Sequence, residues 1–306
     1  QEVIKITNGE IAAKSRLINV SVPANTMYKS ETYFASAKAL NKGDVHVSHV
    51  TGWYVNRSEF EKGKRFNGVI RFATPLYGRE GLQGVVQLAL DYRHLAAYTD
   101  HVIPTQSNPV FEADASTGNY AYMVDNRGIM ISHPNDYHIG GLYPDGNPVP
   151  PLTEQTSAAL TKKGEEVLNL NLMGFIDPNL PLIAKDAATG KSGIKTYKFG
   201  GHTKFVAYAP IKFFSHDYPS PAGFGWIGMG VDVEKFNEIA TKATQNIQKE
   251  AKAWSTTIIL ILVISIVLLF AIAGLLSRGI TRSIEAEVPA DARGEGPFYD
   301  DEEEDK

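Results

Sequence analysis

The sequence predicts an α+β protein in which two tandem antiparallel-sheet modules stand on a helical stalk that continues into one transmembrane helix. Three observations predict this fold class. Two series of short strands are separated by turn residues, apolar residues recur at helical spacing over 232–255, and an uncharged apolar segment spans 256–276.

The apolar segment reads TTIILILVISIVLLFAIAGLL and contains no charge. A helix rises about 1.5 Å per residue, so a segment of this length covers the roughly 30 Å hydrocarbon core of a bilayer. Trp254 precedes the segment, where the membrane interface favours an amphipathic ring, and Arg278 and Arg282 follow it. The sequence therefore predicts a transmembrane helix over 256–276 rather than a buried core helix.

The basic residues on the two sides of this segment nearly balance, because Lys249 and Lys252 precede it. Two other features favour export of the N-terminal part. The chain starts with Gln1 rather than Met, as after removal of a secretion signal, and it contains no cysteine. We therefore expect the large N-terminal domain outside the cytoplasm and the residues from Arg278 onward inside it.

The net charge of −4 is distributed unevenly. Residues 285–306 contain ten Asp and Glu against Arg293 and Lys306, so this tail is strongly acidic and has almost nothing apolar to bury. We expect the tail to be disordered when alone, or held by a partner protein. No basic stripe with interleaved aromatic residues occurs, which excludes a nucleic-acid-binding protein.

The first series of elements precedes Asn119. Its predicted members are a helix at 31–40 and strands at 44–53, 68–75 and 84–90. The strand at 84–90 is expected to be buried. A second helix is expected to extend to 98, with Asp91 as its N-cap.

The second series ends at the stalk. Its predicted members are strands at 120–125, 129–133, 195–199, 203–210 and 224–231, a surface loop at 134–152 and a helix at 153–163. Asp232 is expected to cap a helix that runs without a break into the apolar segment. The predicted domains are 1–29, an N-terminal segment; 30–117 and 118–231, the membrane-distal and membrane-proximal modules; 232–255, the stalk; 256–276, the transmembrane helix; and 277–306, the tail.

Four segments resemble the double Cache sensor domains of bacterial chemoreceptors and sensor histidine kinases, whose modules are PAS-like. They are YFASAKALNKGDVHVS (33–48), VIRFATPLYGREGLQGVVQLALD (69–91), YAYMVDNRGIMISHPN (120–135), and FVAYAPI with GFGWIGMGVDVEKF (205–211 and 223–236). SRGITRSI (277–284) is similar to the start of a HAMP linker. The resemblance implies two tandem Cache modules in the periplasm and an anchor in the bacterial inner membrane.

The sequence departs from this family pattern in three ways. The N-terminal transmembrane helix and the long first helix are missing or shortened, the HAMP pattern stops after Ile284, and no kinase, methyl-accepting or cyclase domain follows. Members of the family that bind amino acids carry an Arg-x-Trp-Tyr element, but Thr51-Gly52-Trp53-Tyr54 lacks its arginine. Capture of an amino acid through this element is therefore not expected.

The candidate ligand-binding residues are aromatic and charged positions of the first module: Trp53, Tyr54, Arg71, Tyr77 and Asp91. In the alternative interpretation these residues are structural. Trp53 and Tyr54 then pack on the sheet, Arg71 forms a surface ion pair and Asp91 caps a helix.

The sequence predicts neither a metal site nor a cofactor, and no enzyme. His46 and His49 would point to opposite faces of a strand, and the HPNDYH segment at 133–138 lacks a third fixed ligand, so loop hydrogen bonding explains it better. The glycines of GFGWIGMG (223–230) fit a closely packed strand rather than a dinucleotide-binding loop. No nucleophile or phosphate-binding motif occurs.

Two functions fit these features. The first is a non-enzymatic subunit whose sensor-like domain acts as a docking scaffold in a larger membrane complex, such as a respiratory or photosynthetic one, with other membrane subunits and the lipid bilayer as partners. The alternative is an extracytoplasmic sensor for a small-molecule ligand. The absent output domain favours the first.

Overall fold

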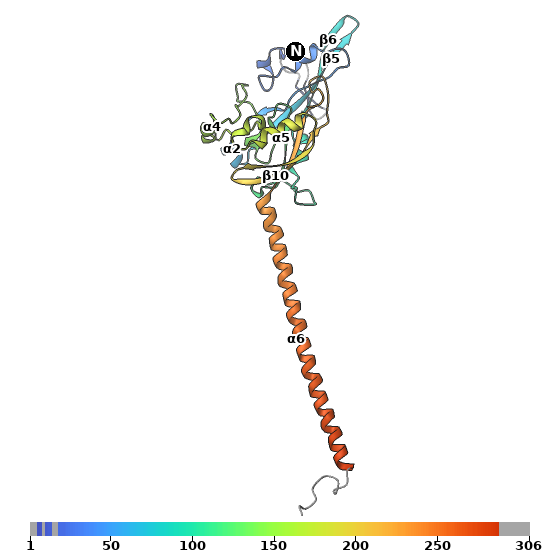
Figure 1. The fold of residues 1–306 in the computed structure, drawn as a ribbon. Coiled ribbons are helices and arrows are strands. Elements are labelled where there is room, and N and C mark those ends of the chain that lie inside the picture. The colour runs from blue at the N-terminus through green and yellow to red at the C-terminus, as the bar shows by residue number, and fades with distance from the viewer. Residues whose placement is uncertain (1–4, 8–9, 14–17, 288–306) are drawn as a thin grey trace, which may run out of the picture. The chain divides into compact units, whose positions relative to one another are not determined.

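The computed structural model describes residues 5–7, 10–13 and 18–287 and divides into two compact units, Gln1–Asn237 and Glu238–Lys306. The larger unit contains antiparallel sheets and short helices, and a single long helix continues through the described part of the smaller unit (Figure 1). The predicted α+β fold class is confirmed. The predicted tail from 288 onward lies outside the described residues.

The first large sheet has four strands: His46–Val47 (β3), Thr51–Trp53 (β4), Asn67–Gly78 (β5) and Gly81–Asp91 (β6). β5 is central, because β3 and β4 pair with one of its edges and β6 pairs with the other. The helices of this part are Tyr33–Lys38 (α1), Arg57–Glu61 (α2) and Arg93–Asp100 (α3). Residues 5–7 (β1) and 10–13 (β2) form a separate hairpin.

The predicted strand over 44–53 is interrupted by a bulge. Val47 lies opposite Phe72, but Thr51 lies opposite Val69, so one extra residue is inserted on the β3–β4 side. The Ser48 amide donates to the Arg71 carbonyl at 2.8 Å, so pairing continues into the bulge. The prediction that His46 and His49 face opposite sides is wrong, since both side chains line one cavity.

The predicted buried strand at 84–90 is instead an edge strand. Val86 and Leu88 are 55% and 66% exposed. Both pair with residues of β5, opposite Thr74 and Phe72. The apolar composition of this strand predicted burial, but composition does not reveal whether both faces of a strand are covered.

The second large sheet has five strands in the order β8-β7-β11-β10-β9. They are Tyr120–Asp125 (β7), Met130–Ser132 (β8), Gly193–Phe199 (β9), His202–Ile211 (β10) and Gly225–Asp232 (β11), close to the predicted strands. Helix α4 (Ser157–Lys163) is shorter than predicted, and α5 (Asn179–Ala188) was not predicted. Short 3-10 turns occur at Pro23–Asn25, Ala115–Thr117, Asp136–His138 and Leu170–Phe175.

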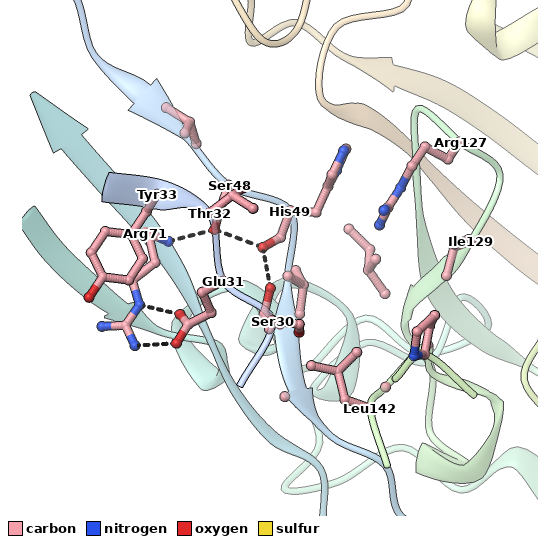
Figure 2. Close-up of a pocket in the computed structure, with 18 of the residues that line it drawn as sticks. Ser30, Glu31, Thr32, Tyr33, Ser48, His49, Arg71, Arg127, Ile129 and Leu142 are labelled. Atoms are coloured by element: carbon pink, nitrogen blue, oxygen red, sulfur yellow. Dashed lines mark hydrogen bonds and ion pairs between the residues drawn. The ribbon is translucent and has the colours of Figure 1, made fainter. Parts of the chain in front are cut away.

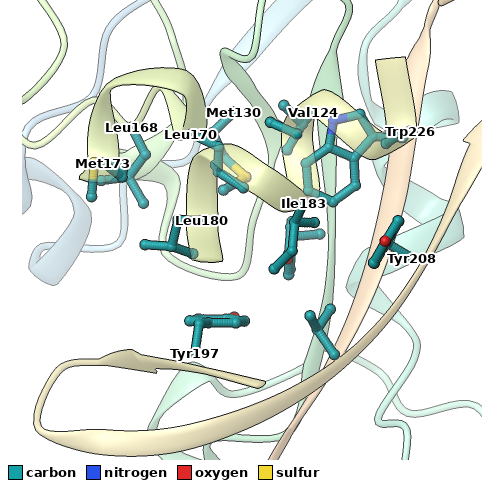
Figure 3. Close-up of a cluster of buried hydrophobic side chains, with 14 of the residues drawn as sticks. Val124, Met130, Leu168, Leu170, Met173, Leu180, Ile183, Tyr197, Tyr208 and Trp226 are labelled. Atoms are coloured by element: carbon teal, nitrogen blue, oxygen red, sulfur yellow. The ribbon is translucent and has the colours of Figure 1, made fainter. Parts of the chain in front are cut away.

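Helix α5 packs on this sheet through Leu180, Ile183 and Ala187, which join a core with Tyr197 and Trp226 (Figure 3). A second core contains residues of both large sheets and the segments beside them: Val47, Val50, Val55, Phe66, Ile70, Tyr92, Ala96, Met123, Ile131, Ile139, Tyr218 and Phe224. Because this core is shared, the two sheets are held together within the larger unit.

The glycines of 223–230 confirm the prediction of close strand packing. Gly225 has φ 154°, and a Cβ at this residue would lie 2.1 Å from the Val124 carbonyl oxygen. A Cβ at Gly228 would lie 2.5 Å from the Tyr122 ring. A side chain at either position would collide with β7.

Helix α6 (Val233–Glu287) contains 55 residues. Asp232 Oδ1 accepts the amides of Glu234 and Lys235 at 3.0 Å, so the predicted cap and the uninterrupted helix are confirmed. Among the described residues, α6 is the one helix long and apolar enough to cross a membrane. The hydroxyls of Thr256, Thr257 and Ser265 donate to carbonyls one turn back, which satisfies these polar groups inside the apolar segment.

Candidate ligand-binding site

A cavity of about 410 Å³ lies between the two large sheets of the larger unit and is called here the inter-module cavity (Figure 2). Its first wall comes from the segment before α1, from β3 and β4 with their bulge, and from Arg71. Its second wall comes from the turn and strand after β7 and from the 140–151 loop. A volume of this size is typical of small-molecule sites.

Arg71 and Glu31 form a buried ion pair in the first wall. The Arg71 Nε to Glu31 Oε1 distance is 2.7 Å, and the Nη2 to Oε2 distance is 3.2 Å. Arg71 Nη1 donates to Gln87 Oε1, and the Tyr28 amide donates to Glu31 Oε2. The two charges therefore satisfy each other, and the pair fixes the segment before α1 onto β5.

A second pair joins His46 to Asp217. The His46 Nδ1 to Asp217 Oδ1 distance is 3.0 Å, and the Val47 amide donates to Asp217 Oδ2 at 2.9 Å. His49 lies nearby, 3.3 Å from the Tyr218 hydroxyl through Nδ1. Burial, together with the charge of Arg127, lowers the pKa of His49 to about 4, so its ring is neutral at pH 7.

Arg127 brings a positive charge to the second wall, and its side chain points toward the cavity in Figure 2. Its Nε and Nη2 donate to Asp125 Oδ2 at 2.8 and 2.6 Å. Nη1 donates no hydrogen bond to any residue that the structure describes. The Asp125 carboxylate is buried and also accepts the amides of Arg127 and Ile129, so it fixes the turn that presents this guanidinium.

Apolar side chains of the second module complete the cavity beside Arg127. They are Ile129, Ile131, Leu142, Pro148, Val149, Pro151 and Val167. A ligand in the cavity therefore meets an arginine and an apolar surface from the same wall.

The five residues predicted from the sequence do not converge on one cavity, and only Arg71 lines this one. The Trp53 ring packs on Tyr28 with centroids 5.2 Å apart. The Tyr54 hydroxyl donates to the Tyr137 carbonyl at 2.9 Å and accepts the Glu166 amide at 2.8 Å.

The Tyr77 hydroxyl donates to the Leu40 carbonyl at 3.0 Å. Asp91 accepts the Arg93 amide at 2.9 Å and pairs with the Arg93 guanidinium at 2.6 Å. Neither side chain lines the cavity. In the alternative interpretation Arg71 formed a surface pair, whereas its pair with Glu31 is buried.

The histidines of the HPNDYH segment make loop hydrogen bonds. His133 Nδ1 accepts the Asn135 amide at 2.9 Å, His138 Nδ1 lies 3.0 Å from the Glu166 carbonyl, and Asp136 accepts the Phe66 amide. These contacts fit the interpretation of this segment as a hydrogen-bonded loop.

No protein-family model and no curated protein matches the chain, but solved structures do. It is similar to the extracellular domain assigned to a histidine kinase at 15% identity, over 71% of this chain and 61% of that one, with a TM-score of 0.40. The ligand-binding domain of Mlp24 solved with asparagine matches at 19% identity, over 69% and 60%, with a TM-score of 0.36. That of the Pseudomonas fluorescens chemoreceptor CtaA in complex with L-serine matches at 17%, over 67% and 61%, with a TM-score of 0.35.

These neighbours are the extracellular domain assigned to a histidine kinase and two ligand-binding domains, one of them from a chemoreceptor. The chain spans about three fifths of their length. At identities of 15–19% and TM-scores of 0.35–0.40 this likeness carries no functional argument, so the geometry of the cavity has to carry it.

Proposed function

We propose that this protein is a membrane-anchored sensor that binds a small organic carboxylate in the inter-module cavity. The observation that carries the proposal is the Arg127 guanidinium, which lines a cavity of about 410 Å³ and keeps Nη1 without a hydrogen-bond acceptor among the described residues. A carboxylate fits this donor because guanidinium–carboxylate hydrogen bonds are charge-assisted.

The charges in the wall favour a carboxylate without an ammonium group. An ammonium needs an acidic partner, but Glu31 is engaged by Arg71, and Asp217 is engaged by His46 and the Val47 amide. The uncharged remainder of the ligand would contact the apolar wall at Leu142 and Val149. A short aliphatic carboxylate meets both requirements.

The same strands connect this site to the start of α6. β7 ends at Asp125, the partner of Arg127, and pairs with β11 from Asp125–Gly225 to Tyr120–Gly230. At the other end, the Asn119 side chain accepts the Asp232 amide at 2.9 Å, and Asp232 caps α6. A ligand that draws Arg127 away from Asp125 therefore acts on the strand pair from which α6 emerges.

We propose further that residues 256–276 of α6 cross the membrane, with the sensor domain outside the cytoplasm and the acidic tail inside. The absence of charge over one bilayer thickness supports the span.

Isothermal titration of the full chain in detergent with propionate, butyrate and L-alanine tests this function. We expect propionate or butyrate to bind, and Arg127→Ala to weaken binding about tenfold or more, the loss expected for a charged hydrogen bond. Arg93→Ala is a matched control, because Arg93 also pairs with an aspartate two residues earlier but does not line the cavity.

Equal affinity of Arg127→Ala and the wild type would overturn the assignment of Arg127. Tighter binding of L-alanine than of propionate would show that the cavity holds an ammonium and that the ligand class is wrong. Failure of all three compounds to bind, together with membrane subunits that co-purify at fixed stoichiometry, would support the docking-subunit hypothesis instead.

A further inference from the structure

A second group of ionisable side chains lies at the edge of the five-stranded sheet where α6 begins. His202 is the first residue of β10, Asp232 is the last residue of β11, and Glu234 lies in the first turn of α6. One nitrogen or oxygen atom from each side chain lies within 4.8 Å of the others. None of the three residues lines the inter-module cavity.

The pairing of the strands brings these residues together. Lys204 lies directly opposite Asp232 in the β10–β11 register. His202 precedes Lys204 by two residues and therefore points to the same face of the sheet, diagonally across from Asp232. Glu234 lies in the first turn of α6, and its Oε2 is 3.8 Å from His202 Nδ1.

Asp232 has one oxygen engaged and one free of hydrogen bonds. Its side chain is 1% exposed, and Oδ1 accepts the amides of Glu234 and Lys235 at 3.0 Å. Oδ2 is buried and accepts no hydrogen bond from the described residues. Oδ2 faces His202 Nδ1 at 3.3 Å. A buried carboxylate oxygen without a donor is costly unless a cation satisfies it.

We propose that His202, Asp232 and Glu234 bind a zinc ion. Zinc binds imidazole nitrogen and carboxylate oxygen at about 2.0–2.2 Å, so the ligand atoms of a tetrahedral site lie about 3.4 Å apart. His202 Nδ1 lies 3.3 Å from Asp232 Oδ2 and 3.8 Å from Glu234 Oε2. All three ligand atoms already lie within 4.8 Å of one another, and the exposed Glu234 side chain can move to close the site, with water in the fourth position.

Two positive charges moderate the affinity. The Lys204 ammonium, which donates to the Gly118 carbonyl at 3.0 Å, lies on the same face and offsets one of the two carboxylates. The N-terminus of α6 carries a partial positive charge as well. We therefore expect micromolar rather than tighter binding. The imidazole ligand favours zinc over magnesium or calcium, which prefer oxygen ligands.

A zinc ion at this place would fasten the β9–β10 turn to the first turn of α6. It would thereby hold the β11–α6 junction through which we propose that the ligand signal leaves the sheet. The binding site itself does not depend on that function, because it is defined by the three side chains alone.

The test is isothermal titration of metal-free full chain in detergent with zinc chloride. We expect one zinc ion per chain with a micromolar dissociation constant and no comparable binding of magnesium or calcium chloride. His202→Ala and Glu234→Gln should each weaken binding about tenfold or more. The control His94→Ala removes another exposed histidine, on α3, and should leave binding unchanged.

X-ray absorption of the zinc-loaded protein should show one imidazole in the coordination shell. The proposal is overturned if zinc does not bind below millimolar concentration. It is also overturned if His202→Ala binds zinc like the wild type, since His202 and Asp232 would then form only an ion pair.

Discussion

The Arg71–Glu31 pair allows a quantitative test of how the inter-module cavity is held. The two side chains are 9% and 4% exposed, and two hydrogen bonds of 2.7 and 3.2 Å join them. Removal of one partner leaves the other as an uncompensated buried charge, which costs about 3–5 kcal/mol. Arg71→Ala should therefore lower the unfolding free energy of the larger unit by about that amount.

A loss of 3–5 kcal/mol corresponds to a fall in melting temperature of about 6–20 °C for a domain of this size. The double variant Arg71→Ala/Glu31→Ala leaves neither charge behind, so its loss should be smaller than the sum of the single losses by about 1–3 kcal/mol. Guanidinium unfolding of the full chain in detergent, followed by tryptophan fluorescence, measures these differences.

The control is Arg93→Ala, which removes the exposed pair with Asp91 and should cost less than about 1 kcal/mol. The reasoning is refuted if Arg71→Ala stays within 1 kcal/mol of the wild type, or if the two single losses add. Either result would mean that this pair does not hold the segment before α1, and would leave Arg71 available to a ligand as the sequence first predicted.

Three further predictions concern stability. Gly225→Ala should prevent folding or severely destabilise the larger unit, because its Cβ would lie 2.1 Å from the Val124 carbonyl oxygen. The control Gly84→Ala would place its Cβ more than 4 Å from every atom beyond its two chain neighbours and should leave the unfolding free energy unchanged in the same assay. Burial lowers the pKa of His138 to about 4, so the unfolded chain binds more protons than the folded chain between pH 6.5 and 4. The unfolding free energy should therefore fall by about 3 kcal/mol as the pH is lowered from 6.5 to 4. His138→Gln should flatten this part of the pH profile. Tyr54→Phe removes a hydroxyl with three backbone partners and should cost about 1–3 kcal/mol without altering carboxylate affinity by titration.

Local sequence patterns predicted much of the fold. Strand alternation and turn residues located β7, β8, β10 and β11 to within about two residues, because hairpin pairing is encoded close together in the chain. The cap at Asp232 and the length of α6 followed from equally local signals.

The cavity depends on contacts that local patterns do not contain. The bulge between Val47 and Thr51 follows from the register with β5 and brings His46 and His49 to the same cavity. Glu31 and Arg71 are forty residues apart in sequence, and nothing local identifies them as partners.

The predicted strands at 120–125 and 129–133 place Arg127 in the turn between them and do not mark it as a site residue. One signal could have marked it, because an aspartate two residues before an arginine in a tight turn can pair with it and present its guanidinium. Asp91 and Arg93 share that spacing, however, and their pair lies outside the cavity. The pattern alone therefore does not locate a site.

The central claim is that Arg127 binds a carboxylate inside the inter-module cavity. The most direct measurement is the dissociation constant of propionate or butyrate, whichever binds the wild type, for Arg127→Ala relative to that for Arg93→Ala. The proposed site predicts a ratio of about ten or more, with Arg93→Ala equal to the wild type. A ratio near one, with both variants folded, would contradict it.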